Sequence, residues 1–369
     1  MLKPNYKNSI LQIKELILNS KRKKTLLVII DAFGYSILKE VLKDKEVKNI
    51  LKKFKIEKIS SVFPTTTTAA LTSIFSGEAP GKHGLYEWEM YSDKIKMEFK
   101  PLKFEAVDEK KQKKFEKIAT KKLIKHKNFM KELSKKKIKV YQILPKEIIN
   151  SNFNFRGGIK IPYRNLVEAI VKTKHAIINE QRKSFFYLYF PQYDESEHTN
   201  GPYQEESIKV VREIIKLLNE EIFGIKGLGV IISADHGCTK IKKEIKLENK
   251  KWFWKDVWKN LKPCCGRKIL PVGSPRDIFL HVKENKVNNV IETLKKKIGK
   301  YAEIYKTDYL IKEGLFGEKV SRQFKKDIGN VTILPKEGII ITFYRDARFK
   351  GFHGGLSKEE IFVPLVKDF

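Results

Sequence analysis

Six side chains of the types that bind divalent metal ions lie at or near the ends of strand-like segments. Asp31 follows the apolar run 26–30, and Asp235 and His236 follow the run 230–232. The other three are Asp194, His198 and His353. Three carboxylates and three imidazoles suit one or two borderline cations such as zinc or manganese. Two such ions close together can activate a nucleophile and hold a phosphoryl group at once, so this is the chemistry that the set would support.

Four consecutive threonines, residues 65–68, supply candidate nucleophiles. A strand is expected to end at Phe63-Pro64, a short helix to begin within the threonines, and Gly77 to end that helix. A hydroxyl at a helix N terminus lies beside free backbone N–H groups, which favour a phosphate and would stabilise an alkoxide. The alternative is that these threonines simply cap the helix.

The elements that must position these groups follow an α/β pattern. Apolar β-branched segments alternate with helical periodicity from about residue 24 to 233, which predicts a mostly parallel central sheet with helices on both faces. The expected strands are residues 25–30, 58–62, 139–143, 185–190 and 229–233, and the expected helices are residues 36–47, 69–75, 165–180 and 205–219. Residues 106–138 are lysine-rich and predict exposed helices over the sheet. The candidate ligands span more than 300 positions, so only folding can assemble them.

After residue 240 the pattern changes to that of a smaller α+β unit. We expect a strand at 277–282, a helix at 287–298 and another extended piece at 331–334. The chain is then expected to return to the main sheet through residues 338–344 and to deliver His353. The predicted organisation is therefore a core formed by residues 1–240 and 337–369, with residues 241–336 as an inserted subdomain.

The threonine segment resembles a known family. The frame Pro64-Thr65-x-Thr67, followed by Gly77, Pro80 and His83-Gly84, is similar to the nucleophile segment of the type I phosphodiesterase/nucleotide pyrophosphatase family of the alkaline phosphatase superfamily. Three further segments follow in the family's order, namely Asp194-x-x-x-His198-x-x-Gly201-Pro202, Ala234-Asp235-His236-Gly237 and Phe352-His353-Gly354. The resemblance covers about residues 25–240 and 338–369 and implies an alkaline phosphatase-like fold.

The resemblance also implies roles for individual residues. It implies two metal sites with the ligands Asp194, His198 and His353 for one ion, and Asp31, Asp235, His236 and the Thr67 hydroxyl for the other. The spacing to Gly77 and His83 selects Thr67 among the four threonines, and His83 is expected to be structural. Taken singly, each ligand has an ordinary alternative: Asp31 as a helix cap, His353 as a loop histidine, and Asp235-His236 as a hydrogen-bonded turn.

The function implied by the resemblance is hydrolysis of phosphodiester or pyrophosphate bonds in nucleotide-like substrates through a covalent phospho-threonine. Trp88 stands where the family usually has an asparagine that binds a phosphate oxygen. It could donate its indole N–H, stack on a planar group or only form a wall of the pocket. A phosphomonoesterase of the same superfamily is therefore an alternative. A basic nucleic-acid-binding protein with an inactive hydrolase core is another.

Composition limits the remaining classes of function. The chain has 369 residues and a formal net charge of +32, which attracts polyanions, although lysines that decorate solvated helix faces explain the same excess. Only three cysteines are present, and Cys264 and Cys265 are adjacent, so neither a disulfide framework nor a CxxC zinc site is expected. The N-terminal segment 1–24 reads as an amphipathic helix and lacks the features of a signal peptide. We therefore expect a cytoplasmic protein without a membrane anchor.

Overall fold

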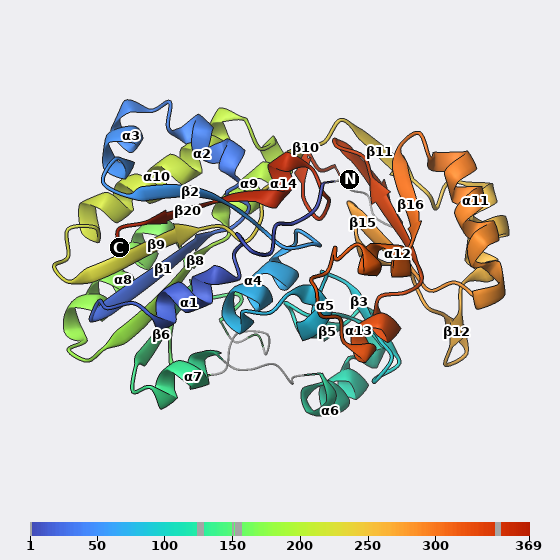
Figure 1. The fold of residues 1–369 in the computed structure, drawn as a ribbon, viewed down its shortest axis with the longest axis horizontal. Coiled ribbons are helices and arrows are strands. Elements are labelled where there is room, and N and C mark those ends of the chain that lie inside the picture. Colours follow the sequence, from blue (N-terminus) through green and yellow to red (C-terminus); the bar gives the residue numbers. More distant parts are fainter. Residues whose placement is uncertain (1, 124–128, 150, 152–156, 344–347) are drawn as a thin grey trace.

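A seven-stranded sheet occupies one half of the molecule (Figure 1). The structure is a computed structural model and describes residues 2–123, 129–149, 151, 157–343 and 348–369. The strand order is β2-β20-β9-β1-β8-β6-β7. The strands are β1 (Lys24–Ile30), β2 (Lys55–Ser60), β6 (Lys139–Pro145), β7 (Ile159–Tyr163), β8 (Ser184–Phe190), β9 (Leu228–Ser233) and β20 (Phe362–Lys367). The strands from β9 to β7 run parallel, and β20 is antiparallel to both of its neighbours. The predicted mostly parallel sheet is confirmed.

The central strands are buried on both faces. In β1 all five residues from Leu26 to Ile30 are 0% exposed, and every residue of β8 is buried. Continuous apolar runs of this kind are typical of parallel strands covered by helices on both sides. In contrast, β7 lies at the edge of the sheet and is mostly solvent-accessible.

Helices cover both faces of this sheet (Figure 1). They are α1 (Gln12–Leu18), α2 (Tyr35–Val41), α3 (Lys45–Leu51), α4 (Thr67–Ser76), α7 (Phe129–Lys135), α8 (Leu166–Asn179), α9 (Gln192–Asn200), α10 (Glu205–Glu221) and α14 (Lys358–Ile361). The short helix α5 (Pro80–His83) follows α4 toward the other half of the molecule (Figure 1), where Gly81 N donates to Phe316 O. The single helix predicted at 36–47 is wrong, because Asp44 begins a new helix by accepting hydrogen bonds from the N–H groups of Glu46 and Val47. Among the described residues, no helix has both the length and the apolar character needed to cross a bilayer.

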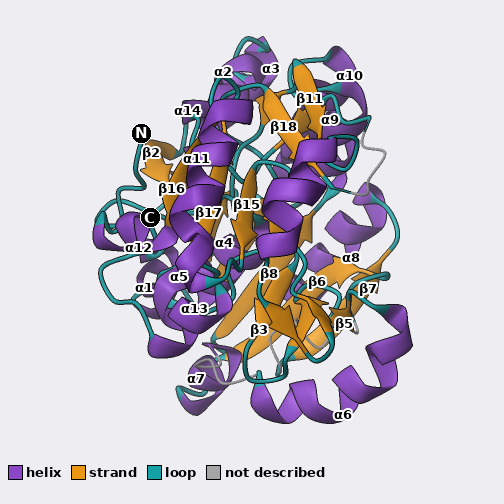
Figure 2. Cartoon of the chain, turned by 90° about the vertical axis from the view of Figure 1, so that its right-hand side faces the viewer, coloured by secondary structure: helices purple, strands orange, loops and turns teal. Residues whose placement is uncertain are grey.

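The other half of the molecule is built on a four-stranded sheet in the order β14-β15-β17-β16 (Figure 2). The strands are β14 (Val272–Ser274), β15 (Asp277–Leu280), β16 (Ala302–Lys306) and β17 (Val331–Pro335). The apolar face of α11 packs against this sheet. The remaining elements of the region are η2 (Phe253–Val257), η3 (Trp258–Asn260), β12 (Pro263–Cys264), β13 (Arg267–Lys268), η4 (Glu284–Lys286), α11 (Val287–Ile298), α12 (Thr307–Lys312) and α13 (Arg322–Asp327). The subdomain boundaries at 241 and 336 stay a prediction.

The route back from this region differs from the prediction. The strand expected at 338–344 does not join the main sheet, because β18 (Ile339–Thr342) pairs in parallel with β11 (Lys243–Lys246). Ile341 is buried there with the core of the four-stranded sheet, so its apolar surface is already covered. His353 instead follows β19 (Gly351–Phe352), which pairs with β10 (Thr239–Lys240). The chain rejoins the main sheet only at β20.

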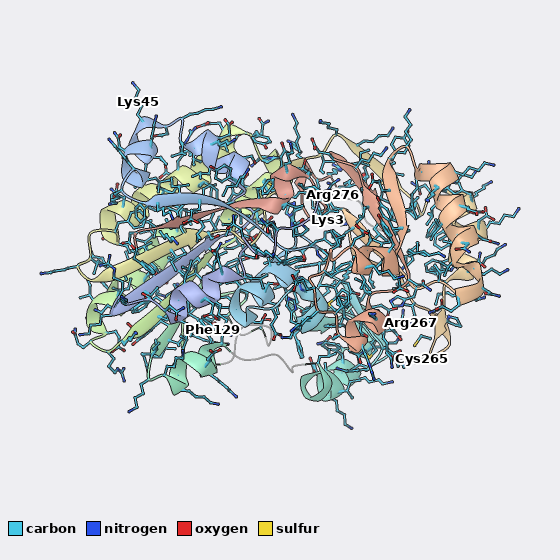
Figure 3. The ribbon with its side chains drawn as sticks, viewed as in Figure 1. Lys3, Lys45, Phe129, Cys265, Arg267 and Arg276 are labelled. Atoms are coloured by element: carbon cyan, nitrogen blue, oxygen red, sulfur yellow. The ribbon has the colours of Figure 1, made fainter. Side chains whose placement is uncertain are left out.

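The first part of the lysine-rich segment 106–138 is placed differently from the prediction, whereas α7 packs against β6 of the main sheet as expected, and residues 124–128 lie outside the described residues. A small sheet of β3 (Met90–Ser92), β4 (Met97–Lys100) and β5 (Glu105–Ala106) is followed by η1 (Glu109–Lys111) and α6 (Gln112–Lys122). Phe115 of α6 is 0% exposed and packs into a core with this small sheet, away from the main sheet. Elsewhere lysine side chains such as Lys45 point into solvent (Figure 3).

Candidate active site

Three adjacent parallel strands deliver candidate ligands to the same edge of the main sheet. Asp31 directly follows β1, α9 carries Asp194 and His198 after β8, and Asp235-His236 follow β9. Ligands of open α/β sheets bind outside the carboxyl ends of the strands. The fold therefore gathers these residues at the edge where a site is expected.

Asp194, His198 and His353 form one compact group. Their candidate ligand atoms all lie within 4.8 Å of one another. His198 Nε2 is 3.3 Å from Asp194 Oδ2, and His353 Nε2 is 3.6 Å from Asp194 Oδ1. This is the set that the sequence predicts for one of the two ions.

A second group surrounds His236. Its Nε2 is 3.4 Å from Asp31 Oδ1 and 3.5 Å from Asp235 Oδ2. The atoms of Asp31, Asp194 and His236 also fall within 4.8 Å of one another, so Asp194 lies between the two groups. The rings of His236 and His353 stack with their centroids 3.8 Å apart. All six predicted ligands are thus brought together in one cluster.

Among the four threonines, Thr67 faces this cluster. It is the first residue of α4, and its Oγ1 is 3.2 Å from His236 Nε2. Thr66 occupies the N-cap position but makes no side-chain capping hydrogen bond. The hydroxyl of Thr65 donates to Gly355 O at 2.8 Å instead. Simple helix capping therefore does not account for the threonine run.

Backbone carbonyls orient all three imidazoles. The Nδ1 atoms lie 2.9 Å from Gly351 O for His198, 3.0 Å from Gly237 O for His236 and 3.0 Å from Thr65 O for His353. A ring that donates its Nδ1–H to a carbonyl presents the Nε2 lone pair for coordination. In each of the three rings, that Nε2 is the nitrogen that faces the carboxylates.

The carboxylates themselves carry unpaired buried oxygens. Asp31 Oδ1, Asp194 Oδ1 and Asp235 Oδ2 have no hydrogen-bond partner among the described residues. Such atoms are costly to bury unless a cation or proton compensates them. Because they face imidazole Nε2 atoms within a mixed oxygen and nitrogen set, the residues present fit divalent metal ions.

Electrostatics of the protein alone agree with this fit. Burial, together with repulsion from Asp235 and Asp194, raises the pKa of Asp31 well above its usual value. Burial also raises the pKa of Asp235 to about 7. Burial opposes the charge of His198, but Asp194 and Glu197 outweigh it and raise the pKa of His198 to about 10. The cluster thus holds protons that a bound dication would displace.

Several residues that shape the site escaped prediction from the sequence. The hydroxyl of Tyr189 donates to Asp31 Oδ2, Thr65 holds the His353 ring, and Glu197 is buried beside His198. No spacing rule marks Tyr189 or Thr65, because their partners are distant in sequence. The only signal for Glu197 is an acidic residue that directly precedes a candidate ligand in α9.

The other residues singled out in the sequence have ordinary surroundings. His83 Nε2 lies 2.9 Å from Ser73 Oγ, and its Nδ1 accepts from Leu85 N at 3.1 Å, so it closes the turn after α5. Trp88 is half-buried, with Lys103 Nζ 6.0 Å from the centroid of its ring.

Comparison with known proteins agrees with these features. The model of the type I phosphodiesterase / nucleotide pyrophosphatase family matches residues 25–356. Solved structures of murine and human ectonucleotide pyrophosphatase/phosphodiesterase 5 each cover 93% of this chain and 87% of their own, with TM-scores of 0.70 and identities of 15% and 17%. An inactive threonine-to-alanine variant of the murine protein in complex with AMP matches with the same coverage, 15% identity and a TM-score of 0.68. A search of curated proteins gave no match.

Likeness at these identities establishes the alkaline phosphatase-like fold, and the family model supplies the more specific assignment. Because that model spans most of the chain, the protein belongs to the type I phosphodiesterase/nucleotide pyrophosphatase family of the alkaline phosphatase superfamily.

Proposed function

We propose that this protein is a two-metal hydrolase that cleaves phosphodiester or pyrophosphate bonds in nucleotide-like substrates through a phospho-threonine. Its family supports phosphodiesterase or nucleotide pyrophosphatase chemistry in general. The observation that carries the proposal is the position of the Thr67 hydroxyl. It lies at the start of α4, 3.2 Å from His236 Nε2, beside buried carboxylate oxygens that lack partners among the described residues.

Two sets of residues would hold the ions. The proposed ligands are Asp194, His198 and His353 for one ion, and Asp31, Asp235, His236 and Thr67 for the other. When bound, two divalent cations, zinc or alternatively manganese, would neutralise phosphoryl oxygens and lower the pKa of a nearby hydroxyl or water. Because Asp194 lies between the two groups, it would couple the two sites.

The chain itself would supply the nucleophile and its orientation. The Thr67 oxygen attacks phosphorus in line, the P–O bond to the leaving group breaks, and the hydroxyl proton passes to solvent or to the leaving oxygen. The first-turn N–H groups of α4 favour the phosphoryl oxygens. Water then attacks the phospho-threonine from the opposite side, and Thr67 recovers its proton. The net reaction adds one water across the ester bond, with retention at phosphorus.

A nucleotide is the substrate class that the comparisons favour. The murine relative was captured with AMP in a variant that lost a threonine and is inactive, and we extend that preference to this chain as part of the proposal. We also keep a cytoplasmic location as part of the proposal, because Cys238, Cys264 and Cys265 are free.

The test compares hydrolysis of bis-p-nitrophenyl phosphate and p-nitrophenyl phosphate with zinc or manganese present. We expect faster turnover of the diester and loss of activity in EDTA. Removal of a nucleophile lowers kcat by at least about 10³-fold, so Thr67→Ala should be nearly inactive. Thr68→Val is the matched control, because Thr68 is the next residue of α4 and its Oγ1 is buried without a partner among the described residues.

Two results would end the proposal: undiminished activity of Thr67→Ala, or full activity after the metal has been removed. An acid quench during turnover followed by peptide mass spectrometry should find phosphate on the Thr67 peptide. A monoester rate above the diester rate would instead favour a phosphomonoesterase.

A further inference from the structure

Glu197 is a fully buried acid beside the candidate metal centre. It lies in α9 between Asp194 and His198 and is 0% exposed. Neither of its carboxylate oxygens makes a well-aligned hydrogen bond to a nitrogen or oxygen atom of the described residues, and its polar neighbours are the imidazole of His198 and the thiol of Cys238. An acid buried in this way costs free energy unless a neighbouring group compensates it. The reaction proposed above gives Glu197 no role.

The carboxylate of Glu197 contacts the Nδ1 atom of His198, a candidate metal ligand. Glu197 Oε1 is 3.2 Å from His198 Nδ1, and Gly351 O is 2.9 Å from the same nitrogen. For His236 and His353, the Nδ1 contacts within the described part of the chain are to backbone carbonyls. His198 is thus the candidate ligand with a carboxylate behind it.

The surrounding backbone leaves space for this carboxylate. A Cβ at Gly351 would lie 1.7 Å from Glu197 Oε2 and 2.8 Å from its backbone oxygen. Glycine at position 351 therefore admits the side chain. Its carbonyl oxygen is the hydrogen-bond partner of His198 Nδ1, and Glu197 Oε1 lies beside the same nitrogen, so β19 and α9 meet at one ring nitrogen.

We propose that Glu197 is a positioning residue that selectively tightens the metal site of Asp194, His198 and His353. A carboxylate that lies against the Nδ1 side of a histidine favours a proton on that nitrogen, and its negative charge strengthens Nε2 as a donor to a metal ion. In the site of Asp31, Asp235 and His236, the Nδ1 of the imidazole contacts a carbonyl and no carboxylate of the described residues. The two sites should therefore differ in affinity. The inference rests on the proposed two-metal function and goes further by assigning this asymmetry to one side chain.

The experiment measures zinc affinity by chelator competition on the full chain after metal removal. Loss of such a supporting carboxylate typically weakens a site by about 10- to 100-fold, so Glu197→Gln should weaken one of the two sites by that factor and leave the other unchanged. Ser196→Ala is the matched control on α9, because its hydroxyl pairs with Ser207 and not with a ligand. Glu197→Asp keeps a carboxylate but moves it away from the His198 ring, so it should weaken the same site less than Glu197→Gln does.

Two further variants, each lacking one proposed metal site, identify the site that Glu197 affects. In Asp235→Asn, the remaining tight site should still weaken when Glu197→Gln is added. In His353→Ala, the same addition should change nothing. Unchanged affinities in Glu197→Gln with two zinc ions bound, or equal weakening of both sites, would overturn the inference and leave the proposed function standing. Failure of the wild type to bind zinc at all would refute the proposed function itself.

Discussion

Replacement of Thr65 by valine should show how much the hydrogen bonds of its hydroxyl contribute to stability, because the packing of the side chain is retained. Thr65 is 0% exposed, donates to Gly355 O at 2.8 Å and accepts from Gly354 N at 3.0 Å. Valine keeps the shape but leaves both of these buried backbone groups unpaired. Each unpaired buried group costs about 1–3 kcal/mol, so we expect the free energy of unfolding to fall by roughly 2–6 kcal/mol.

Function should fall together with stability. Thr65 O accepts from the Nδ1 of His353, and the Thr65–Gly354 bridge joins the nucleophile segment to the segment of this candidate ligand. A loosened bridge would misplace His353 relative to Thr67, so kcat should drop in Thr65→Val even at temperatures where the protein stays folded. Urea titration followed by tryptophan fluorescence, together with diester hydrolysis, measures both effects.

Two neighbouring variants decide whether the reasoning is correct. Thr65→Ser retains the hydroxyl and should lose only the contribution of one methyl group, about 1 kcal/mol. Thr68→Val removes a buried hydroxyl that has no partner among the described residues, and it should cost nothing measurable. If Thr65→Val and Thr68→Val were equally stable and equally active, the hydrogen bonds of Thr65 would carry no such role.

Two further predictions concern buried charge outside the site. The guanidinium of Arg276 (Figure 3) pairs with the Glu360 carboxylate at 2.9 and 2.6 Å, and both side chains are at most 1% exposed. Arg276→Met should therefore lower the free energy of unfolding in urea by about 3–5 kcal/mol, because it leaves the Glu360 charge buried and unpaired. Adding Glu360→Gln should recover part of that loss. Burial lowers the pKa of His281 to about 4 from its ordinary 6.5, so the folded state favours the neutral imidazole. The free energy of unfolding should therefore fall by about 3 kcal/mol as the pH drops from above 6.5 toward 4. His281→Gln should remove this loss in metal-free protein, whereas the exposed His175→Gln should not; equal slopes in all three proteins would contradict it.

Local pattern was sufficient for the elements whose burial is encoded in consecutive residues. The unbroken apolar run of β1 predicts a strand covered on both faces, and the spacing of apolar residues in α8 and α11 predicts their amphipathic faces. Local signals failed where two placements bury the same surface. Residues 339–342 bury their apolar side chains beside β11 as well as they would in the main sheet. Phe115 of α6 is buried against the small sheet and not against the main sheet.

The sequence by itself determined which side-chain types are available at the site and which family the chain resembles, because residue identities and short spacings within a motif can be read directly from the chain. Only the tertiary structure decided that β9, β1 and β8 are neighbours, so that Asp235, Asp31 and Asp194 meet at one edge. It also decided that Asp194 lies between both groups, that Thr65 O is the partner of His353 Nδ1, and that Glu197 lies against His198 Nδ1. These relations depend on contacts between segments that are far apart in the chain, and a local pattern states that a surface must be buried without stating what will cover it.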